Sequence, residues 1–96
     1  MKIPLTKRSI KEILSEWEIR YSKSNRIGRG YMDPSSYTVF INTNQSIAEI
    51  GKTLFHEILH IHYENSGIFV TELQIEMEAR KYYEETDLLD FIHGFL

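Results

Sequence analysis

The stretch TLFHEILHIHYE, residues 53–64, holds three of the four histidines of this 96-residue chain. Just before it, Ser46 followed three residues later by Glu49 is typical of a helix N-terminus. Apolar residues then recur at helical spacing: Ile47, Ile50, Leu54, Phe55, Ile58 and Ile61. The run NSG at residues 65–67 favours a left-handed helix end. The pattern therefore predicts one helix over residues 47–64 that carries the three histidines.

Two of these histidines, His56 and His60, frame Glu57 as H-E-x-x-H. Residues four apart on a helix lie about 40° apart around its axis, so both imidazoles can meet one ion at about 2.0–2.1 Å. Glu57 lies about 100° round, where it can reach a water on the metal without being a ligand. His62 faces away, and Glu64 lies about 12 Å along the axis from His56, which excludes both as ligands.

A third protein ligand must come from elsewhere, and the following helix offers two glutamates. Thr71 with Gln74 predicts a capped helix that runs to about residue 85. If the two helices fold back across the short link, Glu76 arrives level with His60. Glu78 is only slightly deeper but points about 200° away from Glu76 around the helix. Spacing alone leaves the choice between the two glutamates open.

The H-E-x-x-H helix followed by EMEA, residues 76–79, resembles the gluzincin metallopeptidases, in which the first glutamate of Glu-x-x-Ala is a zinc ligand. The resemblance implies a zinc site of His56, His60 and Glu76. TLFHEILH and EMEARKYYEETDLL are also similar to the ImmA/IrrE-type metallopeptidases, and the size and layout resemble the minigluzincins, over about residues 37–89. Arg80 stands where an Asp or Asn usually follows the alanine, and Leu59 stands where a small residue is common.

The resemblance implies hydrolysis of a peptide or protein substrate with one Zn²⁺ per chain. A zinc-bound water would lose its proton to Glu57, the general base, and attack the peptide carbonyl. Tyr82 and Tyr83 are within reach of the oxyanion, although tyrosines at helical spacing are also typical of a core. The substrate backbone would add to the edge of the strand at residues 37–42. The competing interpretation is a catalytically silent, zinc-stabilised module that binds or regulates a protein, and the presence of Glu57 argues against it.

The rest of the chain predicts a small α+β fold, and the resemblance implies that this fold is a zincin-like minimal catalytic core. Thr6 caps an amphipathic helix over residues 7–22, whose apolar face includes Trp17 and Tyr21. Two extended runs, joined by a turn at residues 33–36, form an antiparallel hairpin. We expect a single domain over residues 1–96, with a short antiparallel sheet of two to three strands packed against about three helices.

The tail, residues 86–96, is apolar and carries Asp87, Asp90 and His93, any of which could take the open zinc position. Minigluzincins resemble zymogens in this respect, since a C-terminal segment blocks their site, so the resemblance implies a regulatory tail and a latent enzyme. The alternative is that the tail completes the core or forms a homodimer contact.

Composition excludes several classes of protein. The chain has no cysteine, so disulfides and thiolate metal sites are excluded. Residues 1–29 hold eight basic and three acidic residues, a net charge of +5, whereas residues 30–96 hold three basic and eleven acidic residues, a net charge of −8. Attraction between the two halves accounts for this asymmetry without a nucleic-acid partner, because no nucleic-acid motif is present. No apolar run of signal-peptide or membrane-spanning length occurs, so we expect a cytoplasmic protein with no membrane partner.

Overall fold

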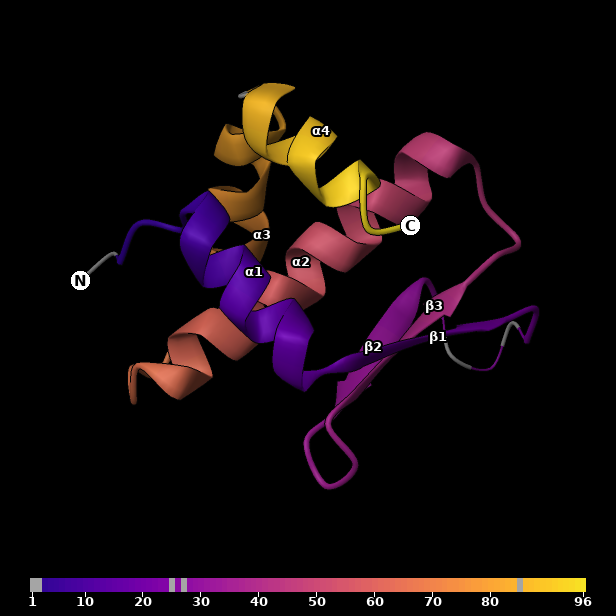
Figure 1. The fold of residues 1–96 in the computed structure, drawn as a ribbon, viewed down its shortest axis with the longest axis horizontal. Helices are drawn as coiled ribbons and strands as arrows, with labels where there is room; N and C mark the ends of the chain where they lie inside the picture. The colour runs from indigo at the N-terminus through magenta and orange to yellow at the C-terminus, as the bar shows by residue number, and fades with distance from the viewer. Residues whose placement is uncertain (1–2, 25, 27, 85) are drawn as a thin grey trace.

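A computed structural model describes residues 3–24, 26, 28–84 and 86–96 of the chain. Helices and strands follow one another as α1 (Lys7–Glu16), β1 (Glu18–Ser22), β2 (Gly30–Asp33), β3 (Thr38–Asn42), α2 (Ile47–Asn65), α3 (Glu72–Tyr83) and α4 (Thr86–His93). Figure 1 shows the strands gathered on one side of the molecule and the helices packed around α2. The predicted α+β class is confirmed.

The local signals for helix ends are mostly confirmed. Ser46 accepts a hydrogen bond from the backbone N–H of Glu49, and Thr71 forms a full capping box with Gln74. Gly67, just after α2, has φ +70°, the left-handed conformation that ends many helices. The helix predicted over residues 47–64 is α2, which extends one residue further. Caps and apolar periodicity are properties of a few consecutive residues, which is why the sequence reveals them.

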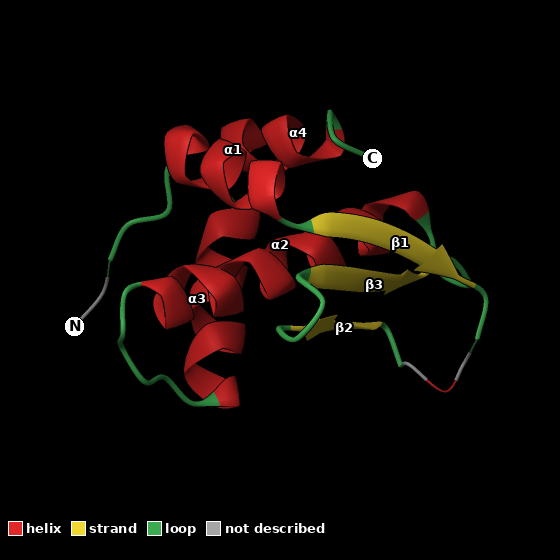
Figure 2. Cartoon of the chain, turned by 60° about the horizontal axis from the view of Figure 1, so that its bottom comes forward, coloured by secondary structure: helices red, strands yellow, loops and turns green. Residues whose placement is uncertain are grey.

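The sheet differs from the prediction in one strand. Its order is β1-β3-β2, with β2 antiparallel to β3 as predicted but β1 parallel to β3 (Figure 2). The helix predicted over residues 7–22 ends at Glu16, and Trp17 turns into extended backbone with φ −108° and ψ 140°. Trp17 is buried and packs edge-on against Tyr37, 5.4 Å between ring centroids. The expectation of a purely antiparallel sheet is therefore wrong, because backbone pairing with β3 outweighs the helical pattern of residues 17–21.

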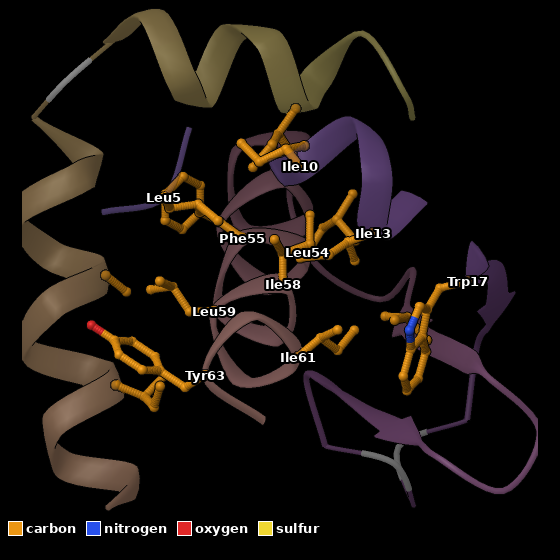
Figure 3. Close-up of a cluster of buried hydrophobic side chains, with 14 of the residues drawn as sticks. Leu5, Ile10, Ile13, Trp17, Leu54, Phe55, Ile58, Leu59, Ile61 and Tyr63 are labelled. Carbon is orange, nitrogen blue, oxygen red and sulfur yellow. The ribbon is translucent and has the colours of Figure 1, made fainter. Parts of the chain in front are cut away.

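The core is built around α2. Six large side chains of this helix are at most 1% exposed: Leu54, Phe55, Ile58, Leu59, Ile61 and Tyr63. Figure 3 shows them surrounded by side chains from the N-terminal segment and α1. Leu59, which stands where a small residue is common in H-E-x-x-H, is completely buried in this core. Because α2 is held on its apolar sides, the face that carries the histidine pair is fixed in direction.

The C-terminal helix α4 belongs to the same core. Ile92 is fully buried, and α4 packs against α1, α2 and α3. A Cβ on Gly51 would overlap the imidazole of His93, so α4 lies close against α2 at that glycine. Asp87 forms an exposed ion pair with Lys7 on α1, with 3.4 Å between Oδ2 and Nζ. None of the helices in the described part of the chain is long and apolar enough to cross a membrane.

Candidate metal centre

His56 and His60 project from the same side of α2, as the helical spacing predicts. Their ring centroids are 5.0 Å apart, and their side chains are 16% and 23% exposed. His62, two residues further on, turns away, and its Nε2 lies 3.1 Å from the backbone carbonyl of Ile3. The prediction that His62 lies outside the site is confirmed. The pair is thus partly shielded from water yet accessible from one side.

The carboxylate that lies between the two imidazoles belongs to Glu72. Its Oε1 lies 2.6 Å from Nε2 of His56, and its Oε2 lies 2.8 Å from Nε2 of His60. One donor atom from each of the three residues falls within 4.8 Å of the others. His56, His60 and Glu72 therefore form a group that could hold a metal ion.

Sequence reasoning missed Glu72. This residue is the first of α3, directly after the N-cap Thr71, and it precedes Glu76 by one helical turn. Residues four apart lie on the same face of a helix, so a helix that turns Glu76 toward α2 also turns Glu72 toward it. Helical periodicity predicts that Glu72 and Glu76 share a face of α3. The angle at which α3 crosses α2 then decides which of these two glutamates reaches Nε2 of both histidines.

The two glutamates considered from the sequence lie in different places. Oε2 of Glu76 is 3.5 Å from Nδ1 of His56, and the Glu76 side chain is 41% exposed. Glu78 is buried at 9% exposure, and its Oε2 accepts a hydrogen bond of 2.5 Å from the hydroxyl of Tyr63. The Tyr63 hydroxyl points toward α3 in Figure 3. Of the two, Glu76 lies at the site and Glu78 is held in the core.

Glu57 lies next to His56 on α2 and lines a cavity that His56, Glu72 and Glu76 also line, although only 8% of the residue is exposed. Burial raises the pKa of Glu57 to about 6, the charge of His56 opposes this rise, and the nearby Glu72 carboxylate adds to it. A carboxyl group with a pKa near 6 exchanges its proton readily around neutral pH. Glu57 can therefore accept a proton and later return it.

The pKa shifts of His60 and Glu72 both favour the protonation states in which these residues bind a metal ion. Burial lowers the pKa of His60, although the Glu72 carboxylate beside it acts in the opposite direction. Burial by itself would raise the pKa of Glu72, but hydrogen bonding to His56 and the charges of both histidines bring the pKa below its usual value. A neutral imidazole and an ionised carboxylate are the forms that bind metals.

A cavity of about 360 Å³ opens beside His56. Its lining is largely charged and polar: Arg29, Gly30, Glu49, Lys52, Thr53, His56, Glu57, Glu72, Glu76 and Tyr83. A second hollow has a more apolar wall, which is formed by His60, Tyr63, Glu64, Gly67, Ile68, Phe69 and Val70. His56 therefore lines the first cavity and His60 lines the second hollow.

The two tyrosines proposed from the sequence have separate environments. The hydroxyl of Tyr83 donates to the carbonyl of Lys52 at 3.1 Å, and Tyr83 lines the cavity. Burial raises the pKa of Tyr83 to about 12, so it remains protonated. The hydroxyl of Tyr82 instead accepts a hydrogen bond of 2.9 Å from the backbone N–H of Leu5. Only Tyr83 is placed to face a molecule in the cavity.

The C-terminal residues considered as blocking groups lie elsewhere. Among the described residues that line the cavity there is none from α4. Asp87 pairs with Lys7, and His93 packs over Gly51. The structure thus places the tail as a packed helix of the core, which is the alternative that the sequence left open.

The expected free edge at residues 37–42 is not available. β3 is the central strand and pairs with β1 on one side and β2 on the other, so this prediction is wrong. β2 is the edge strand on the cavity side, since Gly30 lines the cavity. A Cβ on Gly30 would lie 2.6 Å from the carbonyl oxygen of Phe40 and 2.7 Å from Cγ2 of Thr53. Glycine at this position lets β2 approach both β3 and α2, which brings the sheet edge to the cavity that His56 lines.

Comparison with protein-family models, with curated protein sequences and with solved structures finds no match for this chain. The likeness to the gluzincins consequently stays a prediction from the H-E-x-x-H and EMEA motifs. The described fold and the group of His56, His60 and Glu72 stand independently of it.

Proposed function

We propose that the chain is a zinc-dependent peptidase in which His56, His60 and Glu72 hold the ion and Glu57 is the general base. The observation that carries the proposal is the position of a buried carboxyl group, with its pKa raised to about 6, next to a group of two histidines and a carboxylate. A site that served only to stabilise the fold would have no need of such a base.

The donor set fits zinc. Two imidazole nitrogens and one carboxylate oxygen form the usual protein ligand set of a catalytic zinc site, which keeps a further position for water or substrate. The absence of cysteine makes a thiolate site inapplicable, and the histidine pair argues against magnesium or calcium, which prefer oxygen ligands. Bound zinc would supply a Lewis acid that polarises the substrate carbonyl and lowers the pKa of water.

The groups of the chain have distinct roles in this reaction. Glu57 accepts a proton from the attacking water and delivers it to the leaving amine. The outer edge of β2, which pairs with no other strand in the described part of the chain, offers backbone N–H and C=O groups to an extended peptide beside the cavity. The side chains of Arg29 and Lys52 are donors at the cavity wall that can face a developing oxyanion, whereas the hydroxyl of Tyr83 already donates its proton to the carbonyl of Lys52. The substrate class is therefore a peptide or an extended segment of a protein.

A second function has one observation in its favour. Glu76 lies one helical turn from Glu72 on the same face of α3, so a turn of the Glu76 side chain from the Nδ1 side of His56 to the Nε2 side would give one ion four protein ligands. Sites closed by four protein ligands are usually structural. In that case the chain would be a metal-stabilised module that binds a protein partner and cleaves nothing.

The test measures zinc content and peptide hydrolysis on the same preparations. We expect about one zinc per wild-type chain, loss of zinc in His56→Ala, and retention in the matched control His62→Ala. We expect Glu57→Gln to keep zinc and lose cleavage of a mixture of quenched fluorogenic peptides. A wild-type protein that binds no zinc contradicts the proposal, and a zinc-loaded wild type that cleaves no better than Glu57→Gln favours the structural module.

A further inference from the structure

We propose that Glu72 and Glu76 have different roles in the metal site: Glu72 binds the ion, whereas Glu76 is a positioning residue that holds the His56 ring from its Nδ1 side. This inference rests on the proposed metal site. It assigns a role to Glu76 that differs from the ligand role implied by the EMEA motif.

The two carboxylates approach His56 at different atoms. Glu72 lies 2.6 Å from Nε2, and Glu76 lies 3.5 Å from Nδ1. The two nitrogens of an imidazole point to opposite sides of the ring, so one ion cannot bind Nε2 and also lie beside a group at Nδ1. The position of His60 indicates that Nε2 is the nitrogen of His56 that faces the ion. Nε2 of His60 lies 2.8 Å from the other oxygen of the same Glu72 carboxylate. The shared centre is therefore on the Nε2 side of both rings.

The geometry of α3 explains how both glutamates reach one histidine. Glu72 and Glu76 are four residues apart and emerge from one face of the helix, about 6 Å apart along its axis. That spacing lets them bracket the His56 ring at its two ends. Glu78 is excluded from this arrangement because Tyr63 holds its carboxylate in the core.

A ring that binds metal through Nε2 must carry its remaining proton on Nδ1. Metal-binding histidines usually donate this N–H to a carboxylate or carbonyl, which fixes the tautomer and the ring orientation. Glu76 is the carboxylate that the structure places beside Nδ1 of His56. At 3.5 Å the contact is a few tenths of an ångström longer than a typical hydrogen bond, so a small rotation of the Glu76 side chain completes it.

The two roles respond differently to glutamine, which keeps the shape and a neutral acceptor oxygen but lacks the charge that a ligand supplies. As a positioning residue, Glu76 should tolerate Glu76→Gln with a change in zinc affinity below about tenfold, while Glu76→Ala weakens zinc binding by about 10–100-fold. Glu72→Gln should weaken zinc binding by more than Glu76→Ala does. Glu84→Gln, at the C-cap of the same helix, is the matched control and should leave the affinity unchanged.

The experiment measures zinc affinity by competition with a chromophoric chelator, together with ¹⁵N NMR of the histidine rings in the zinc-loaded protein. We expect the wild type to bind zinc through Nε2 of His56 with the proton on Nδ1. In Glu76→Ala the Nδ1 proton should exchange faster with water while the zinc stays on Nε2. Circular dichroism of each variant verifies that the helices are intact, and the glutamine variants preserve side-chain size.

Three results would overturn the assignment. If Glu76→Gln loses zinc and Glu72→Gln keeps it, the roles are reversed and Glu76 is the ligand, while the proposed function survives. If both glutamine variants lose zinc equally, both carboxylates are ligands and the positioning role is wrong. If the wild type binds no zinc, the proposed function fails and this inference fails with it.

Discussion

The hydrogen bond between Tyr63 of α2 and Glu78 of α3 offers the most direct test of how the two helices pack against each other. Tyr63 is 1% exposed and donates a hydrogen bond of 2.5 Å to a carboxylate that is itself buried at 9% exposure. Hydrogen bonds to charged groups contribute about 1.5–3 kcal/mol, and a buried charged acceptor that loses its donor adds a desolvation cost. We therefore expect Tyr63→Phe to lower the free energy of unfolding by about 2–3 kcal/mol.

A double-mutant cycle isolates this contribution. Tyr63→Phe, Glu78→Leu and the double variant are unfolded in urea at pH 7 with the same excess of zinc. Once Glu78→Leu has removed the carboxylate, Tyr63→Phe should cost much less, which gives a coupling energy of about 1.5–3 kcal/mol. Zinc affinity should be unchanged in all three variants, because Glu78 faces the core. A coupling energy below about 0.5 kcal/mol, or loss of zinc in Glu78→Leu, would refute the described packing of α3 against α2.

The same pair predicts a difference at alkaline pH. Burial, hydrogen bonding to Glu78 and the charge of Glu78 raise the pKa of Tyr63 from its usual 10.0 to about 12. The folded state therefore holds this proton more tightly than the unfolded state. The resulting stability is fully present below pH 10 and is lost as the pH rises through about 12. Tyr63→Phe should lack this part of the alkaline loss, and identical alkaline unfolding curves would contradict the prediction.

Other predictions address the proposed general base, Glu57, and the packing of the C-terminal helix α4. Glu57→Gln should retain zinc and lose peptide cleavage, and unchanged cleavage would exclude Glu57 as the base. Gly51→Ala should destabilise the fold because its Cβ overlaps His93, whereas in a His93→Ala background it should stabilise the helix by about 1 kcal/mol, as measured by thermal unfolding; the same sign in both backgrounds would contradict the packing of α4. Ile92→Ala should cost about 2–5 kcal/mol in urea unfolding because the side chain is fully buried. Deletion of residues 86–96 should give a less stable protein in the same assay, and a deletion that gains cleavage without loss of stability would restore the blocking role of the tail.

The helix that carries the candidate site could be read from the sequence in detail. Its N-cap, its end near Gly67 and the common side of His56 and His60 all follow from residues within a few positions of one another. Helix periodicity fixes the direction of side chains relative to the helix axis without knowledge of the rest of the fold. The same local logic gives the capped start of α3 and places Glu57 at the edge of the histidine face.

Three features depended on contacts between distant segments. Trp17–Tyr21 has a helical pattern, but pairing of residues 18–22 with β3 makes it extended. The choice of Glu72 over Glu76 at Nε2 follows from how α3 crosses α2, and local spacing carries no information about crossing angles. From the sequence we expected the tail to block the site and kept core packing or a dimer contact as the alternative. Its placement followed from the fit of Ile92 and His93 against α2. Packing of this kind depends on shapes that only the assembled fold provides.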